Sequence, residues 1–317
     1  MSVLVFIESN LNKFKKSDLE AASYAAALAA NQSSTAIAIA FNIDDCSPLG
    51  AYGITKVFTC STTNFNASSY ALTISALAQQ ESISTIVCSS SSNAKYIAPL
   101  LAAALNASYV PNVIALPNSD QPKVFLRNVF SNKGIAHTEI ISEYSIIGIA
   151  PNAFGVHEQP TDIKQVDFTM HASTSTTTSD AIETASDKVS IADADIVVSA
   201  GRGLKGPENW GMIEELASVL GAATACSKPV SDMGWRPHSE HVGQTGKPVA
   251  CNLYIAIGVS GAIQHLAGVS ASKTKLVINT DPEAPFFKAA DYGIVGDAFE
   301  VVPKLIEKLK AFKGENN

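Results

Sequence analysis

Residues 195–210 read DIVVSAGRGLKGPENW, and this stretch decides how the second half of the chain folds. An apolar run comes first, a glycine-rich turn follows, and residues 209–220 then place apolar side chains on one helical face. The order predicts a strand, a tight turn and a helix. The turn, residues 201–206, reads G-R-G-L-K-G and fits the G-x-G-x-x-G pattern of a pyrophosphate loop. Pro207 suits the first position of the helix.

The glycine pattern alone leaves more than one interpretation open. A nicotinamide-binding loop needs an acidic residue about 20 positions later, which binds the ribose hydroxyl. Residues 225–228 read ACSK at that distance and contain no carboxylate. A dehydrogenase that uses the loop from Gly201 to Gly206 is therefore only an alternative. Arg202 lies inside the loop, where a guanidinium suits a phosphate or a flavin, or is simply solvated.

A second glycine-rich turn from strand to helix is GVSGAIQH, residues 258–265. Gly258 and Gly261 allow backbone N–H groups to approach an anion at the start of the helix. Ser260 is not a hydrolase nucleophile, because the G-x-S-x-G elbow needs glycine where the chain has Ala262. We expect Ser260 to be the N-cap residue of the helix.

Two polar segments complete this set. Residues 240–247 read EHVGQTGK, whose amides and hydroxyl can hold the polar edge of a ring, although an ordinary turn has the same composition. Asp297 and Glu300 form D-x-x-E before an apolar helix. This is a capping-box signature, and capping is enough to explain Asp297 without a ligand.

The first half of the chain alternates strand-like and helix-like segments, which predicts βαβ units and a parallel sheet. The expected strands are residues 3–7, 35–41, 56–59 and 84–88, and the expected helices are 18–30, 70–79 and 95–105. After Pro111 the rhythm changes to closely spaced strands at 124–130, 138–141 and 145–149. We expect these to form an antiparallel addition to the sheet that continues through residues 164–170.

Residues 171–188 are rich in Ser and Thr and predict a linker. The boundary is therefore placed near residue 190, with one domain over 1–190 and a second over 191–317. The second domain repeats the parallel pattern, with strands expected at 195–199, 254–257, 276–278 and 292–295 and a last helix at 298–310. The sequence thus predicts an α/β protein of two domains, each built on a mainly parallel sheet.

Composition narrows the class of protein. The chain has 317 residues, of which 46% are hydrophobic and 16% charged, so it can build real cores. Its net charge of −7 disfavours nucleic acid as a partner. It has no apolar run of membrane-spanning length, and the opening MSVLVFIES is too short for a signal sequence, so we expect no membrane insertion and a cytoplasmic protein.

Cysteine and histidine spacing argues against metal or disulfide chemistry. The five cysteines are odd in number and far apart, and no C-x-x-C pair occurs. Four of the histidines show no metal-ligand spacing: His137, His157, His171 and His238. We expect buried thiols and no metal site.

Four runs in the second half resemble the α subunit of electron transfer flavoprotein. They are SAGRGLKGPENW (199–210), VGQTGK (242–247), LYIAIGVSGAIQHLAG (253–268) and INTDPEAPFFKAADYGIV (278–295). The resemblance extends over nearly all of residues 195–310. The first half resembles the family only in its βα rhythm and its opening strand.

The resemblance implies that the second domain is a FAD-binding nucleotide fold that holds one FAD per heterodimer. It implies Arg202 beside the flavin, Ser227 at the ring and diphosphate, Thr245 near flavin N5 and His265 near the O2 edge. Residues 260–265 correspond to the diphosphate turn. The full implied set is Arg202, Ser227, Lys228, Val242, Gly243, Gln244, Thr245, Ser260, Gly261, Ala262, Ile263, Gln264, His265, Asn279, Asp297 and Ala298, of which the last three lie at the adenosine end.

Two residues depart from the family pattern as the resemblance defines it. Lys228 stands where the family usually has an arginine over the flavin ring, and His241 stands where it often has glutamine. Both keep polar contact possible. The departures therefore bear on redox tuning rather than on FAD binding.

The implied function is electron transport without a catalytic site on a substrate, so the protein would be a carrier rather than an enzyme. Acyl-CoA dehydrogenases of fatty acid β-oxidation and related flavoenzymes would reduce it, and a quinone oxidoreductase would accept its electrons. The resemblance also implies a β subunit that holds AMP, with the first domain as its platform. The alternatives are the NAD-dependent dehydrogenase already described and a non-redox nucleotide-binding interaction protein.

Overall fold

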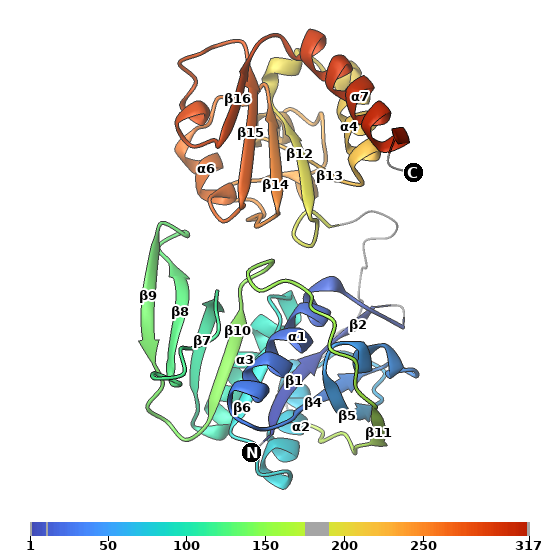
Figure 1. Cartoon of the computed structure of the whole chain (residues 1–317), viewed down its shortest axis with the longest axis vertical. Coiled ribbons are helices and arrows are strands. Elements are labelled where there is room, and N and C mark those ends of the chain that lie inside the picture. The colour runs from blue at the N-terminus through green and yellow to red at the C-terminus, as the bar shows by residue number, and fades with distance from the viewer. Residues whose placement is uncertain (1, 11, 175–189, 316–317) are drawn as a thin grey trace. The chain divides into compact units, whose positions relative to one another are not determined.

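The computed structural model describes residues 2–10, 12–174 and 190–315 (Figure 1). The chain divides into two compact units, called unit 1 (Met1–Phe130 and Gly134–Thr184) and unit 2 (Ser131–Lys133 and Ala185–Asn317). Most of the predicted linker, residues 171–188, lies outside the described residues. The domain boundary at residue 190 stays a prediction.

Unit 1 is built on a nine-stranded sheet. Its strands are β1 (Val3–Ile7), β4 (Ala36–Phe41), β5 (Ile54–Cys60), β6 (Thr85–Cys88), β7 (Ser108–Val113), β8 (Val124–Val129), β9 (Gly134–Glu139), β10 (Ser145–Ile149) and β11 (Lys164–Asp167). Its other elements are α1 (Lys16–Asn31), α2 (Ala67–Gln80), α3 (Ser92–Leu105), the 3-10 turn η1 (Ser47–Ala51) and a short hairpin of β2 (Ser9–Asn10) and β3 (Lys13–Phe14). The sheet order is β11-β5-β4-β1-β6-β10-β7-β8-β9, and all pairs from β11 to β7 are parallel. The predicted mainly parallel sheet is confirmed.

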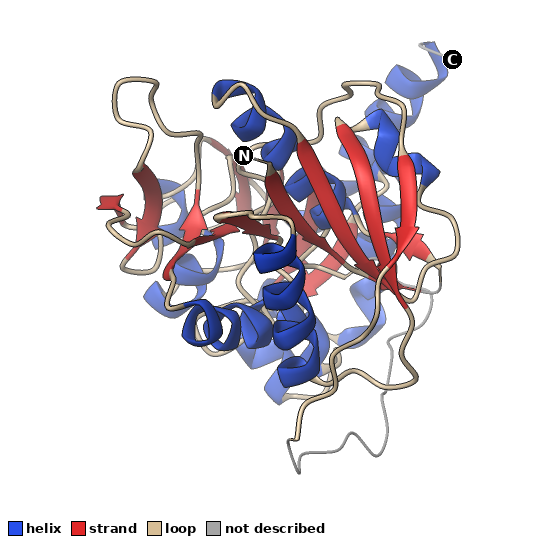
Figure 2. Cartoon of the chain, turned by 90° about the horizontal axis from the view of Figure 1, so that it is seen from below, coloured by secondary structure: helices blue, strands red, loops and turns tan. Residues whose placement is uncertain are grey.

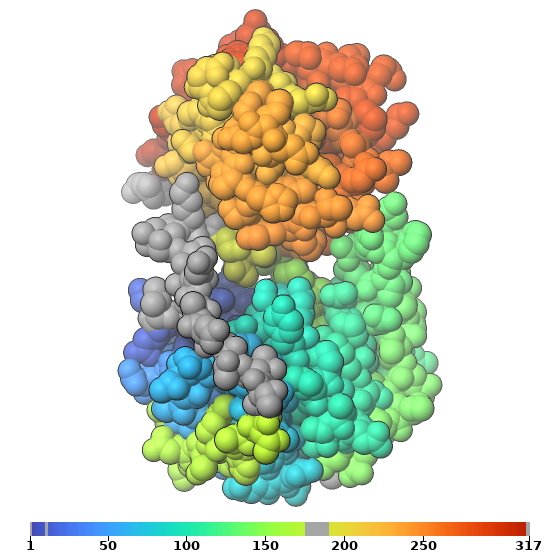
Figure 3. Space-filling model, turned by 180° about the vertical axis from the view of Figure 1, so that it is seen from behind, coloured from blue at the N-terminus to red at the C-terminus, as the bar shows by residue number. Residues whose placement is uncertain are grey.

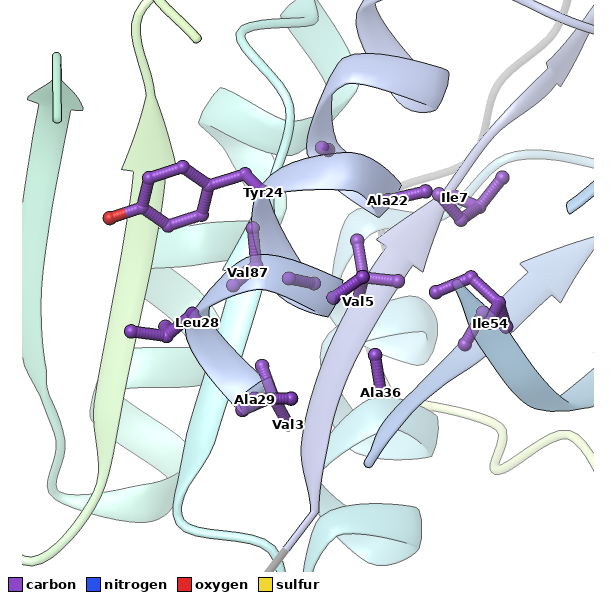
Figure 4. Packing of buried hydrophobic residues seen from close by; sticks show 14 of the residues in the cluster. Val3, Val5, Ile7, Ala22, Tyr24, Leu28, Ala29, Ala36, Ile54 and Val87 are labelled. Carbon is purple, nitrogen blue, oxygen red and sulfur yellow. The ribbon is translucent and has the colours of Figure 1, made fainter. Parts of the chain in front are cut away.

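Strand β1 shows why helices cover both faces of this sheet (Figure 2). All five of its residues are buried, and alternate side chains enter two different cores. Val3, Val5 and Ile7 pack with α1, as Figure 4 shows, whereas Leu4 and Phe6 pack with α2 and α3. A continuous apolar run is the expected signature of a strand that is buried on both sides.

Helix α1 lies close to the sheet because its buried face consists largely of alanine. The buried alanines are Ala21, Ala22, Ala25, Ala26 and Ala29. The fit is tight enough to constrain the neighbouring turn, where Gly53 has φ +83° and a Cβ at this position would lie 2.5 Å from the Cβ of Ala26. Glycine is required there by both conformation and space.

The predicted antiparallel addition is only partly correct. Strands β7, β8 and β9 do pair antiparallel at one edge. Strand β10, however, is parallel and lies between β6 and β7, and β11 is parallel to β5 at the opposite edge. The physical reason is burial, because every residue of β10 is buried and an apolar run of this kind belongs in the middle of a sheet.

Unit 2 is built on a five-stranded sheet in which every pair is parallel. Its strands are β12 (Ile196–Ala200), β13 (Ala223–Cys226), β14 (Leu253–Ile257), β15 (Thr274–Asn279) and β16 (Tyr292–Val295). Its helices are α4 (Gly211–Leu220), α5 (Lys228–Asp232), α6 (Ile263–Val269) and α7 (Ala298–Glu315), with 3-10 turns η2 (Arg202–Leu204), η3 (Pro207–Trp210), η4 (His238–Glu240) and η5 (Pro285–Lys288). The order β13-β12-β14-β15-β16 reverses direction between β12 and β14, and ligands of open α/β sheets bind at such a switch point.

The cysteines, the potential metal ligands and the helices were also subjects of expectations from the sequence. All five cysteines are free and buried, as predicted. In the part of the chain that the structure describes, no group of three or more His, Cys, Asp or Glu is arranged to hold a metal. Every described helix is too short or too polar to span a bilayer.

Two carboxylates of α1 are buried in very different surroundings. Glu20 accepts three backbone hydrogen bonds of 2.8–2.9 Å, from Asn152, Phe154 and Gly155. Asp18 is fully buried, and no described residue makes a hydrogen bond of normal geometry to either of its oxygens. Burial, and to a lesser degree the nearby Glu8, raises the pKa of Asp18 from 3.8 to about 7.

We predict that Asp18→Asn stabilises unit 1 at alkaline pH. Because the folded pKa is raised, the contribution of Asp18 to the free energy of unfolding is unreduced below pH 4 and falls by up to about 4 kcal/mol as the pH rises to about 7. The neutral amide avoids this loss. Thermal unfolding at pH 5 and pH 8 should show a difference in melting temperature between variant and wild type, and this gap should be larger at pH 8. The exposed Asp120→Asn is the matched control, and an equal gap at both pH values would contradict the prediction.

Candidate functional site

The residues predicted to bind FAD lie at one edge of the five-stranded sheet. In a parallel sheet the carboxyl ends of all strands meet at the same edge. Arg202 follows β12, Lys228 follows β13, residues 258–262 follow β14, Asn279 ends β15 and Asp297 follows β16. The structure therefore brings together five segments that are up to 95 residues apart (202 to 297) in the sequence.

The turns after β12 and β14 touch at the switch point, backbone against backbone. A Cβ on Gly203 would lie 2.6 Å from the Cα of Gly258, and one on Gly201 would collide with the Gly258 carbonyl. The Gly203 N–H donates to the Gly258 carbonyl at 3.2 Å, and Gly258 itself has φ +61°. Packing alone thus explains these glycines, so G-x-G-x-x-G here gives no support to a nicotinamide site.

The turn after β14 presents backbone donors that have no acceptor. Within the described part of the chain, none of the N–H groups of residues 259–262 donates a hydrogen bond. Gly261 has φ +86°, and a Cβ there would lie 2.5 Å from the Phe286 nitrogen. Consecutive free N–H groups at a strand-to-helix turn are suited to bind an anion such as the diphosphate of a dinucleotide.

One expectation about this turn is wrong. Ser260 does not cap the helix, because α6 begins at Ile263 and its N-cap residue is Ala262. The Ser260 carbonyl instead accepts from the Phe286 N–H at 3.1 Å. Two more turn residues, held in place by Phe286, separate the serine from the helix, so its side chain is exposed at the edge of the sheet.

The V-G-Q-T loop, residues 242–245, is attached to helix α6. The Gln244 N–H donates to the Gln264 carbonyl at 2.8 Å, and a Cβ on Gly268 would lie 2.5 Å from the Cα of Gly243. The side chains of Gln244 and Thr245 are exposed. The loop therefore has a fixed backbone and polar side chains that are free to meet a ligand.

His265 is buried in a pocket of aromatic side chains. Its Nε2 lies 2.9 Å from the Tyr254 hydroxyl, and its ring packs against Phe286 and Tyr254. Burial, followed by the nearby His241, lowers the pKa of His265 to about 4. Burial also lowers the pKa of His241. His265 is consequently a neutral imidazole at physiological pH and supplies no positive charge.

Positive charge at this edge comes from exposed side chains, Arg202 and Lys228. The carboxylate of Asp297 has structural partners: its Oδ1 accepts a hydrogen bond from the Phe299 N–H at 3.0 Å, and its Oδ2 lies 3.7 Å from Nζ of Lys205. Capping by Asp297 is as predicted. Asn279 donates to the Val259 carbonyl at 3.0 Å and so fixes the end of β15 to the turn after β14.

The fold and this edge define unit 2 as an α/β domain that binds a nucleotide cofactor. The family model described as electron transfer flavoprotein domain matches residues 3–189, and the one described as electron transfer flavoprotein FAD-binding domain matches residues 190–270. The chain belongs to the electron transfer flavoprotein α-subunit family, and its second half carries the FAD-binding domain. The recognition made from the sequence is confirmed.

Two relatives match this chain over most of its length, and a third matches a shorter part at higher identity. The α subunit of electron transfer flavoprotein from Syntrophomonas wolfei is 36% identical over 265 residues, covering 82% of this chain and 84% of its own length. The α subunit from Bacillus subtilis is 36% identical over 266 residues and 82% of each chain. The one from Thermoanaerobacterium thermosaccharolyticum reaches 55% identity over 125 residues, 39% of this chain and 38% of its own.

Sequence reasoning missed residues that act through other residues. Tyr254 was seen only as part of a strand, although its hydroxyl holds His265. Arg236 was not noticed at all, although it is mostly buried and joins three segments of unit 2. A charged residue between Trp235 and Pro237 carries no local signal, because its partners lie 4 and 22 positions away.

We predict that Gly261→Ala destabilises unit 2 by about 1–3 kcal/mol, because it combines a positive φ with a collision against the Phe286 backbone. FAD should be lost while unit 1 stays folded. Gly211→Ala is the control, since a Cβ there meets nothing within 4 Å. Urea unfolding and flavin content measure both effects, and a stable, FAD-loaded Gly261→Ala protein would refute the prediction.

Proposed function

We propose that the chain carries electrons through an FAD held at the carboxyl edge of the five-stranded sheet. The observation that carries the proposal is the row of unpartnered N–H groups at residues 259–262, at the same sheet edge as the exposed cations Arg202 and Lys228. Backbone donors suit a diphosphate, and cations suit a ring that gains negative charge. When bound, the flavin takes up and releases electrons, and the protein supplies orientation and charge.

Each residue group has a distinct task in this proposal. Residues 260–265 hold the diphosphate, residues 242–245 lie along the ribityl chain and ring, and Ser227 lies at the ring and diphosphate. Asn279, Asp297 and Ala298 meet the adenosine end. Arg202 and Lys228 stabilise the reduced ring. His265 packs beside it as a neutral hydrogen-bonding group whose orientation Tyr254 sets.

The electron donors and the electron acceptor are proposed from membership of the family. We propose that acyl-CoA dehydrogenases of fatty acid β-oxidation reduce the carrier and that a quinone oxidoreductase oxidises it. No substrate is transformed at the site, so the protein is a carrier and not an enzyme. The cytoplasmic location inferred from the sequence stays a prediction.

Unit 1 is proposed as the platform for a β subunit that binds AMP. Large apolar side chains are exposed on α2, on α3 and around the β8–β9 hairpin. They are Leu72, Tyr96, Leu100, Phe130, Ile135 and Ile141. Tyr96 and Leu100 are one helical turn apart on α3, which packs beside α2 on a face open to view in Figure 3. Exposed apolar groups of this kind mark interaction surfaces.

We predict that the full chain co-purifies with a β subunit in a one-to-one complex that shows a flavin absorption spectrum. Released cofactor should be one FAD per complex, because the proposal assigns a single FAD to the edge of the five-stranded sheet. A colourless complex that binds NADH would favour the dehydrogenase. A colourless complex that binds neither cofactor would favour the non-redox interaction protein.

We predict that Lys228→Met lowers the two-electron midpoint potential of the bound flavin by about 10–20 mV. Reduction adds negative charge, and an exposed cation stabilises it by about 0.5–1 kcal/mol, which corresponds to that shift. Lys228→Arg should hold or raise the potential. Lys308→Met, which removes the same charge from helix α7, is the control. Equal potentials in the wild type and Lys228→Met would show that Lys228 does not face the ring.

A further inference from the structure

The segment between β13 and the V-G-Q-T loop is a closed loop, residues 227–240. Its two ends meet in a bridge between Cys226 and His241, where the Val242 N–H donates to the Cys226 carbonyl at 3.0 Å. Ser227 and Lys228 open this loop, and Val242 follows it directly. The position of the loop therefore affects Ser227 and Lys228 on one side and residues 242–245 on the other, which the proposed function assigns to the flavin.

One mostly buried guanidinium, that of Arg236, holds the last part of this loop. The Arg236 side chain is only 15% exposed and binds Glu240 through two hydrogen bonds, Nε to Oε2 at 2.8 Å and Nη2 to Oε1 at 2.7 Å. A third bond joins its Nη1 to Oε1 of Glu214 on α4 at 3.0 Å. Its guanidinium carbon lies 5.3 Å from the ring centre of Trp210.

These three partners come from the elements that surround the site. Trp210 ends η3, which follows the Arg202 turn, Glu214 belongs to α4, and Glu240 ends η4 just before the V-G-Q-T loop. The hydrogen bonds to Glu240 raise the pKa of Arg236, so the guanidinium stays charged. Only a planar fork can bind two carboxylates and lie against a ring at once.

We propose that Arg236 is a positioning residue for FAD, which fixes the loop of residues 227–240 and thereby the placement of Lys228 and Thr245. This inference rests on the proposed FAD site. Arg236 is outside the set of residues assigned to contact FAD. The inference is that it nevertheless affects the affinity for FAD and the potential of the flavin. A change of geometry at reacting groups is costly even when it starts from a remote residue.

Variants can separate positioning from stability. Arg236→Met leaves Glu240 buried without its partner, which destabilises the fold, whereas removal of both charges in Arg236→Met/Glu240→Met restores stability. Arg236→Lys keeps the charge without the fork. Glu215→Gln is the control, because Glu215 neighbours Glu214 on α4 but pairs on the exposed surface with Lys310 at 2.7 Å.

The experiment measures melting temperature, the Kd for FAD by flavin fluorescence and the flavin midpoint potential, all on the full chain in its complex. We expect the double variant to melt like the wild type yet bind FAD about tenfold more weakly, with a shifted potential. Arg236→Lys should have a Kd and a potential between those of the double variant and the wild type. Glu215→Gln should match the wild type in all three measurements. If the stable double variant has the wild-type Kd and potential, the inference is overturned. If the wild type itself holds no FAD, it is the proposed function that fails.

Discussion

The cofactor edge of unit 2 depends on a contact between two backbones that leaves no room for a side chain. Gly203 and Gly258 meet where the strand order reverses, between β12 and β14. This contact brings the Arg202 turn against the turn that presents residues 259–262. The V-G-Q-T loop is then fixed to α6 by a second contact of the same type, between Gly243 and Gly268. Glycine is used here for packing between loops, while the side chains of Gln244, Thr245 and Ser260 remain exposed.

Charge at this edge is divided between buried and exposed groups. Burial makes His265 a neutral imidazole, and Tyr254 fixes its orientation. The cations Arg202 and Lys228 are exposed, and Asp297 is occupied by capping and by Lys205. The arrangement offers positive charge where an anionic ring would lie and keeps the buried part of the site uncharged, apart from the Arg236–Glu240 pair.

Much of this architecture could be predicted from the sequence because it is local. Strand β1 is a continuous apolar run, helix α1 is an alanine-rich segment, and the motifs of unit 2 identified its family. Strands β10 and β11 were misplaced because their partners lie far away in the chain, which no local pattern records. Strand β13, with the sequence Ala-Thr-Ala-Cys, was missed because small residues do not form an apolar run. Arg236 was missed because only the fold brings its carboxylates and Trp210 together.

The alanine face of helix α1 limits how this protein can evolve. The alanines of this face are buried, and the side chain of Ala26 leaves no room for even one added carbon at Gly53. A larger residue would require the helix to move away from the sheet, which overpacked cores resist. We therefore expect amino-acid substitutions in unit 1 to accumulate mainly on its outer surfaces. Those surfaces are also where a partner would bind, so the faces most open to mutation are those on which partner choice depends.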